Sequence, residues 1–154
     1  MKIFFKIFIV LIFAFALTGC IGEDYDVGVP TAHISLDTSS VQLTEANIRW
    51  NTESEDVQNS IKDIEKYASS LDEIQVFSGQ KVFLEFKENE DNGGDIWTNP
   101  KITVALLKNG ERTELVLDET RGFHFPTDKG NYFLEVEFIN SAGSAQYVGN
   151  VVIK

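Results

Sequence analysis

Apolar and polar residues alternate with a period of two through much of the second half of the chain. The alternation runs through residues 82–86, 102–106 and 132–138. Successive side chains of a strand point to opposite faces, so the pattern predicts strands with one face in a core. The Asn109-Gly110 pair between two such segments is typical of a two-residue hairpin turn. A mainly β fold is therefore predicted, with further short strands at 32–37, 41–44 and 47–51.

Residues 52–73 depart from this pattern and have apolar residues spaced three and four apart. Thr52 followed by Glu55 resembles a capping box at a helix start. We therefore predict a helix at about 53–72, whose apolar face is formed by Val57, Ile61, Ile64, Ala68 and Leu71. Several strand residues are apolar on the faces opposite the main core, and we expect the helix to cover them by lying across one sheet. These residues are Phe83, Ala105, Leu107 and Phe133. The alternative is that this helix binds a partner.

A motif near the end of the chain indicates the type of β fold. The segment 128–132 reads D-x-G-x-Y and is followed by Leu134. It resembles the tyrosine corner of immunoglobulin-type sandwiches, in which the tyrosine hydroxyl bonds back to nearby backbone. The resemblance covers roughly residues 74–154 and implies an Ig-like antiparallel β-sandwich, here with one accessory helix. Leu134 stands where antibody domains carry cysteine, so the resemblance is to the broad architecture.

The first twenty residues have the organisation of an export signal. Lys2 and Lys6 precede an apolar run of eleven residues, Ile7 to Leu17, which is short for a membrane span of about 20. The segment Leu17-Thr18-Gly19-Cys20 resembles the lipobox of bacterial lipoprotein precursors. The resemblance implies cleavage between Gly19 and Cys20 and a lipid on Cys20. An ordinary secretory signal or an uncleaved anchor remains the alternative.

These segments predict three parts of the chain. Residues 1–19 form the signal peptide, 20–28 the lipidated N-terminus and tether, and 29–154 the sandwich domain. The resemblance implies a lipid-anchored protein on the extracytoplasmic face of the cytoplasmic membrane, or in the outer membrane if the organism has one. Removal of residues 1–19, which carry two lysines and no acids, changes the formal net charge from −11 to −13. A charge of this sign argues against nucleic acid as a partner.

The sequence carries no catalytic motif that we can identify. Its two histidines, His33 and His124, lie far apart and cannot by themselves form a zinc site, which needs three or four ligands. No G-x-S-x-G motif accompanies them. Cys20 is the only cysteine and is assigned to the lipid, so no thiol remains for a disulfide or a nucleophile. We therefore expect a protein that is not an enzyme, with no cofactor.

Two features of the segment between residues 87 and 100 are candidate sites. Glu90, Asp91, Asn92 and Asp95 supply the oxygen ligands that calcium prefers, although without the full spacing of a calcium loop. A solvated loop is the favoured interpretation, and no metal site is predicted. Trp97 is a candidate contact for a sugar or peptide ligand, or a plug at the end of the sandwich, which we favour.

The predicted function follows from the anchor and the fold class. We expect a non-enzymatic binding or protein-interaction module of the cell envelope, with the membrane contacted through Cys20 and an envelope protein as partner. The alternative is a small-ligand-binding or metal-binding accessory subunit of a transporter or envelope enzyme.

Overall fold

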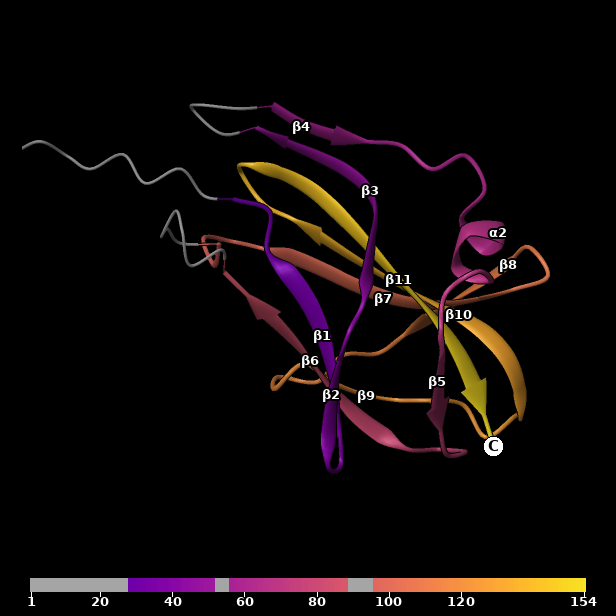
Figure 1. The fold of residues 1–154 in the computed structure, drawn as a ribbon. Coiled ribbons are helices and arrows are strands. Elements are labelled where there is room, and N and C mark those ends of the chain that lie inside the picture. Colours follow the sequence, from indigo (N-terminus) through magenta and orange to yellow (C-terminus); the bar gives the residue numbers. More distant parts are fainter. Residues whose placement is uncertain (1–27, 52–55, 89–95) are drawn as a thin grey trace, which may run out of the picture.

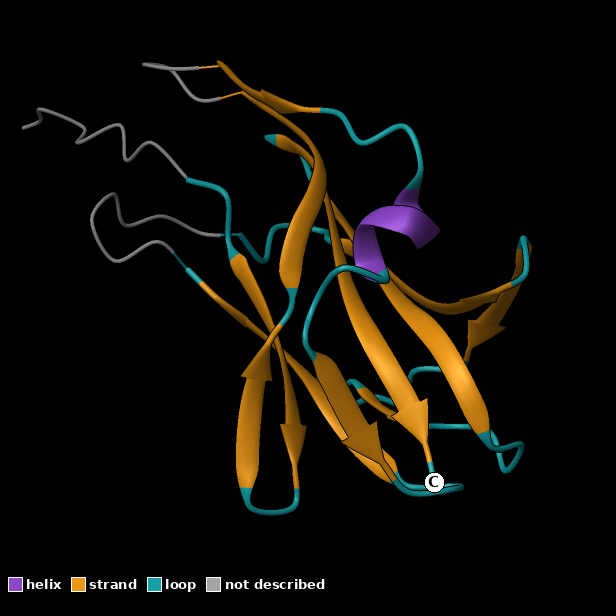
Figure 2. Cartoon of the chain, turned by 45° about the vertical axis from the view of Figure 1, so that its right-hand side comes forward, coloured by secondary structure: helices purple, strands orange, loops and turns teal. Residues whose placement is uncertain are grey.

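The computed structural model describes residues 28–51, 56–88 and 96–154. In these ranges the chain is mainly β, as predicted, with one short helix (Figures 1 and 2). The elements are β1 (Thr31–Leu36), β2 (Ser39–Gln42), β3 (Thr44–Asn51), β4 (Asp56–Asn59), α2 (Ile64–Ala68), β5 (Glu73–Val76), β6 (Lys81–Lys87), β7 (Lys101–Lys108), β8 (Glu111–Leu115), β9 (Gly122–His124), β10 (Gly130–Ile139) and β11 (Gly143–Ile153).

The strands form two sheets that pack against each other. The smaller sheet has the order β2-β1-β6-β9, and the larger has the order β4-β3-β11-β10-β7-β8. Neighbours in both orders are antiparallel, whereas β5 joins β11 in parallel. Since β10 occupies one edge of β11, β3 and β5 share the other edge in succession. β3 pairs with residues 143–148 of β11, and β5 pairs with residues 150–153.

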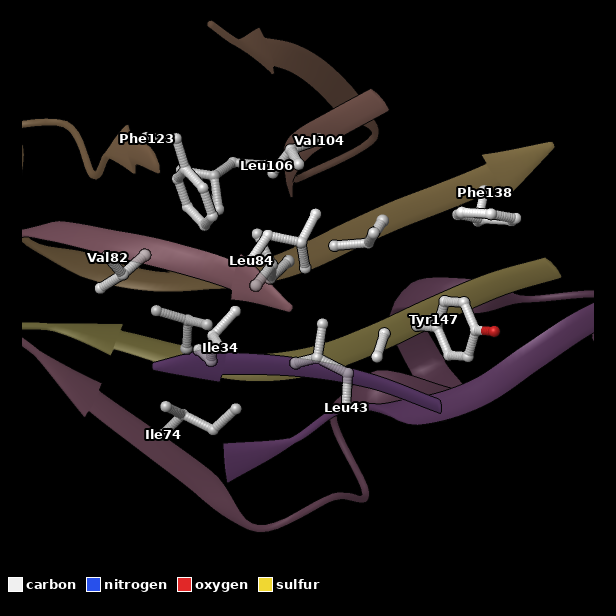
Figure 3. Close-up of a cluster of buried hydrophobic side chains, with 14 of the residues drawn as sticks. Ile34, Leu43, Ile74, Val82, Leu84, Val104, Leu106, Phe123, Phe138 and Tyr147 are labelled. Carbon is white, nitrogen blue, oxygen red and sulfur yellow. The ribbon is translucent and has the colours of Figure 1, made fainter. Parts of the chain in front are cut away.

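The core fills the space between the sheets and confirms the predicted sandwich (Figure 3). Its largest fully buried side chains include Trp50, Tyr147 and Phe138. The Tyr132 hydroxyl donates a hydrogen bond to the Asp128 carbonyl oxygen at 3.1 Å. The tyrosine corner is therefore present, and Leu134 is completely buried two residues later.

Two turns depend on residues that tolerate unusual backbone geometry. Asn109 and Gly110 have φ values of 55° and 81°, and Lys108 pairs with Glu111 across them. The hairpin predicted from this dipeptide is confirmed. Gly143 has a φ of 155°, and a Cβ on it would lie 2.1 Å from the Arg49 carbonyl oxygen. Only glycine permits β11 to approach β3 so closely there.

The predicted helix at 53–72 is wrong in its extent. Only Ile64–Ala68 are helical, Asp56–Asn59 form β4, and residues 52–55 lie outside the described ranges. Val57 pairs with Trp50 in the β3–β4 hairpin, so strand pairing overrides the helical spacing there. The helix begins after Asp63, whose carboxylate accepts a hydrogen bond from the Lys66 amide at 2.9 Å.

The helix packs on part of the outer face of the larger sheet, as predicted for one sheet, but of the four residues that it was expected to cover only Phe133 belongs to its cluster. Ala68 of α2 packs on Ala46 and Val148, and all three residues are fully buried. Phe133 is among the partly buried residues that surround this second, smaller core. Phe83 lies on the other sheet and remains 41% exposed, so the helix does not cover it.

Candidate functional site

Most of the site residues predicted from the sequence lie outside the described ranges. They are Gly19 and Cys20 at the N-terminus and Glu90, Asp91, Asn92 and Asp95 in the segment that follows β6. Their roles stay predictions. Within the described residues, no group of three or more histidine, cysteine or acidic side chains is arranged to hold a metal ion.

Trp97 lies at one end of the sandwich and is half-buried. Its ring meets Phe86 and Phe138 edge-on, with centroid separations of 6.3 and 6.2 Å. The Arg121 guanidinium carbon lies 4.5 Å from the indole centroid. Trp97 therefore packs against the end of the core, while its role as a ligand contact stays a prediction.

The two histidines both lie on the smaller sheet, in different settings. His33 of β1 is 9% exposed, and its Nε2 lies 2.9 Å from the Thr31 hydroxyl. Burial, reinforced by the charge of Lys87, lowers the pKa of His33 below its usual value. His124 of β9 is exposed, and its Nδ1 lies 3.2 Å from the Gly79 carbonyl oxygen.

A network of polar side chains crosses the outer face of the larger sheet. The Arg112 guanidinium donates to Glu135 at 2.7 Å, and the Gln146 amide donates to the other Glu135 oxygen at 2.8 Å. Asn47 extends the chain by donating to Gln146 at 2.6 Å. The hydrogen bond to Glu135 raises the pKa of Arg112 above its usual value. These side chains hydrogen-bond one another, so the network links β3, β11, β10 and β8 across this face.

The feature best suited to binding is a cleft along the open side of the sandwich, which we call the seam cleft. It lies between β2 and β5 and has a volume of about 370 Å³. Leu36 and Val41 line it from the smaller sheet, and Ile74 and Val148 from the larger. The partly exposed apolar side chains in this depression are Leu36, Val41 and Leu71, whereas Ile74 and Val148 are buried.

The seam cleft exists because β3 leaves the edge of β11 before β5 joins it. Gly149 lies at this junction, between the last pair with β3 and the first pair with β5. A Cβ on Gly149 would lie 3.0 Å from Leu43 Cδ2 and 3.0 Å from Ile74 Cδ1. Figure 3 shows these two side chains among the buried cluster. Glycine thus allows side chains from the two sides of the junction to approach β11.

Two strand edges are also open at the seam cleft. β2 is the terminal strand of the smaller sheet, and among the described strands β5 pairs with β11 alone. Asp72 and Glu73 are the ionisable residues that line the cleft, which therefore has an acidic rim. No sequence pattern predicts this site, because its lining comes from segments far apart in the chain.

A second hollow is more polar. It follows the β3–β4 hairpin, has a volume of about 560 Å³, and is lined by Asn47, Arg49, Gln58 and Asn59, among others. The Asn47 amide group already bonds Gln146, and its carbonyl oxygen accepts a hydrogen bond from the Ile61 amide at 2.6 Å. Part of this polar lining is thus used within the fold.

Comparison of the chain with models of protein families, with curated proteins and with solved structures finds no match. Separately, none of the helical structure within residues 28–51, 56–88 and 96–154 has the length and apolar character to span a bilayer.

Proposed function

We propose that this protein is a lipid-anchored binding module on the extracytoplasmic face of a cell membrane, and that it acts without catalysis. The anchor is Cys20, on the resemblance of Leu17-Thr18-Gly19-Cys20 to a lipobox. A diacylglycerol on its thiol supplies two acyl chains, and two chains hold a protein stably where one binds only reversibly.

The observation that carries the proposal is the short distance along the chain between Cys20 and the folded domain. β1 begins at Thr31, so only residues 21–30 separate it from Cys20. Ten residues reach at most about 35 Å when fully extended. A domain held by this tether stays near the membrane surface and meets partners within the envelope.

The open seam cleft supports a binding role for the domain. It combines accessible aliphatic side chains with two strand edges and an acidic rim, which are features of a surface that recognises another chain. By contrast, the polar network of Arg112 and Glu135 is internally satisfied and serves the fold.

Anchoring is tested with Cys20→Ala expressed in a bacterial host that is fed a radioactive fatty acid. The variant should lose the label and leave the membrane fraction, whereas Thr18→Ala, which keeps a small residue in the lipobox, should retain both. Labelled Cys20→Ala would contradict the anchor.

Binding is tested separately by crosslinking intact cells that carry the labelled wild-type protein. The proposal expects a reproducible adduct with a specific envelope protein. Absence of any adduct above that of an unrelated lipoprotein would contradict the binding role while leaving the anchor in place.

A further inference from the structure

We infer that the seam cleft binds an extended, basic segment of another protein, which adds to the free edge of β5 as a further strand. The inference deepens the proposed binding function by naming the surface and the chemistry of its partner. It does not depend on the lipid, because the lining residues on which it rests belong to the sandwich.

The backbone of β5 has hydrogen-bonding groups that point away from its one partner strand. The Val76 carbonyl accepts a hydrogen bond from the Lys154 amide at 2.9 Å, and the Ser78 amide donates to the Lys154 carbonyl at 3.0 Å. In a parallel pair, alternate residues direct their N–H and C=O groups to the same neighbour. Val76 and Ile74 therefore face β11, whereas Glu73 and Gln75 direct theirs toward the free edge.

The side chains of the cleft suit an added strand. Alternate side chains of an extended segment point to opposite faces. One set would meet the partly exposed apolar side chains of Leu36 and Val41, and the other set would face water. Backbone bonds to a strand edge and pockets for alternate side chains are the two components of recognition by strand addition.

The charge of the cleft favours a basic segment of another protein over a second copy of this chain. Among the described residues, Asp72 and Glu73 are the charged residues that line the cleft. The nearby cation is Lys154, whose Nζ donates a hydrogen bond to the Gln75 side-chain oxygen at 2.8 Å, so two carboxylates face one ammonium group at this edge. The chain as a whole carries a formal charge of −11. A second copy of this chain would bring like charge to an acidic rim, whereas a segment with lysine or arginine on its water-facing side is attracted to it.

The probe is a fluorescent octapeptide of alternating valine and lysine, titrated against the full chain in detergent micelles and followed by anisotropy. The matched control is the alternating valine–glutamate octapeptide. We expect the lysine peptide to bind at least tenfold more tightly. Equal affinity of the two peptides would overturn the inference.

Variants at the edge separate strand addition from general attraction between opposite charges. Gln75→Pro removes the one N–H that faces the free edge at this position, a change that edge strands tolerate, and should weaken binding at least tenfold. Gln75→Ala keeps the N–H and should bind as wild type. Glu73→Lys should also weaken binding, whereas Glu119→Lys, an equal charge change at an exposed turn, should have little effect.

A readout on the wild-type protein avoids any dependence on how the variants fold. Bound lysine peptide should slow amide hydrogen exchange at Glu73 and Gln75, and the same peptide with methylated backbone nitrogens should not bind. Binding that survives methylation, or that leaves both amides unprotected, would overturn strand addition. Sedimentation that shows a dimer of the chain, lost in Gln75→Pro, would assign the edge to a second copy and likewise overturn the inference.

Discussion

The outer faces of both sheets carry apolar residues, yet these residues are covered differently. On the larger sheet, Val148 is buried with Ala68 of α2, and Phe133 packs against this cluster. The Arg112–Glu135 pair links strands of the same sheet. On the smaller sheet, Phe83 is 41% exposed and lies beside Lys81, whose Nζ is 5.1 Å from the ring centroid. An apolar residue on the outward face of a strand is therefore insufficient to predict that a helix covers it.

The size of the residues under the helix explains part of this difference. Ala46 and Ala68 are small, so the helix backbone can approach the larger sheet and exclude water from Val148. The covered face has become a second core, and the smaller sheet's outer face has remained a surface. Substitutions that are chemically matched on the two faces should therefore have unequal effects.

The largest difference is expected for a charge placed on each face. Val148→Asp puts an unpaired carboxylate beneath α2 and should lower the free energy of unfolding by about 3–5 kcal/mol. Phe83→Asp leaves its carboxylate in water and should cost less than half as much. Urea unfolding of both variants measures this, and equal losses would show that the two faces are alike.

Removal of one aromatic ring from each face should have a smaller effect. Phe133→Ala opens a gap beside the second core of Ala46, Ala68 and Val148 and should cost about 2–3 kcal/mol. Phe83→Ala removes a ring that is already partly hydrated, so its cost should stay below about 1 kcal/mol. The same unfolding measurement checks both, and a Phe83→Ala loss as large as that of Phe133→Ala would contradict the comparison.

Neutralisation of a glutamate on each face should have a smaller effect again. Glu135 is buried and accepts hydrogen bonds from Arg112 and Gln146, so Glu135→Gln should cost about 1 kcal/mol. Glu85 is exposed and accepts from Ser35 at 2.8 Å, so Glu85→Gln should change stability by less than about 0.5 kcal/mol. A Glu135→Gln variant as stable as wild type would show that the network does not stabilise the covered face.

The smallest effect should be a pH dependence that comes from the smaller sheet. Burial lowers the pKa of His33, so the folded protein binds a proton less readily at this site than the unfolded chain does. Its contribution to stability is present above the unfolded pKa of about 6.5 and is lost as the pH falls through the lower folded pKa. Unfolding curves from pH 7.5 down to 5 measure this loss.

His33→Gln should reduce this loss of stability between pH 7.5 and 5. The matched control is His124→Gln, because His124 lies on the same sheet and is exposed. If both variants have the pH profile of the wild type, burial of His33 does not contribute to the pH dependence of stability.

The strands of the second half could be predicted because their signals are local. Phe123 and Phe125 are buried on either side of exposed His124, and the Asn109-Gly110 turn has the positive φ values that its residues favour. The β4 strand could not be predicted in this way, because its four residues are held by pairing with β3 rather than by their own preference. The helical spacing there was a coincidence that tertiary pairing overrides.

The candidate sites likewise differ in whether local sequence or tertiary structure reveals them. Trp97 could be selected from its residue type and its place before Pro100, but only the fold shows that Phe86, Phe138 and Arg121 surround it. The seam cleft could not be found from the chain, since Leu36, Ile74 and Val148 come from three distant segments. The periodicity of the sequence does not indicate where β3 ends its pairing with β11 and β5 begins.

The sequence alone determined the alternating faces of the strands, the turns that need glycine or asparagine, and the tyrosine corner at Tyr132, because each depends on neighbouring residues. It also carries the lipobox-like segment on which the proposed anchor rests. The tertiary structure decided that β4 is a strand, that α2 covers the larger sheet, and that β3 and β5 meet at Gly149 with a cleft between β2 and β5. These features depend on which of several distant segments pairs with a given strand edge or packs on a given apolar surface. Local sequence patterns do not specify that choice.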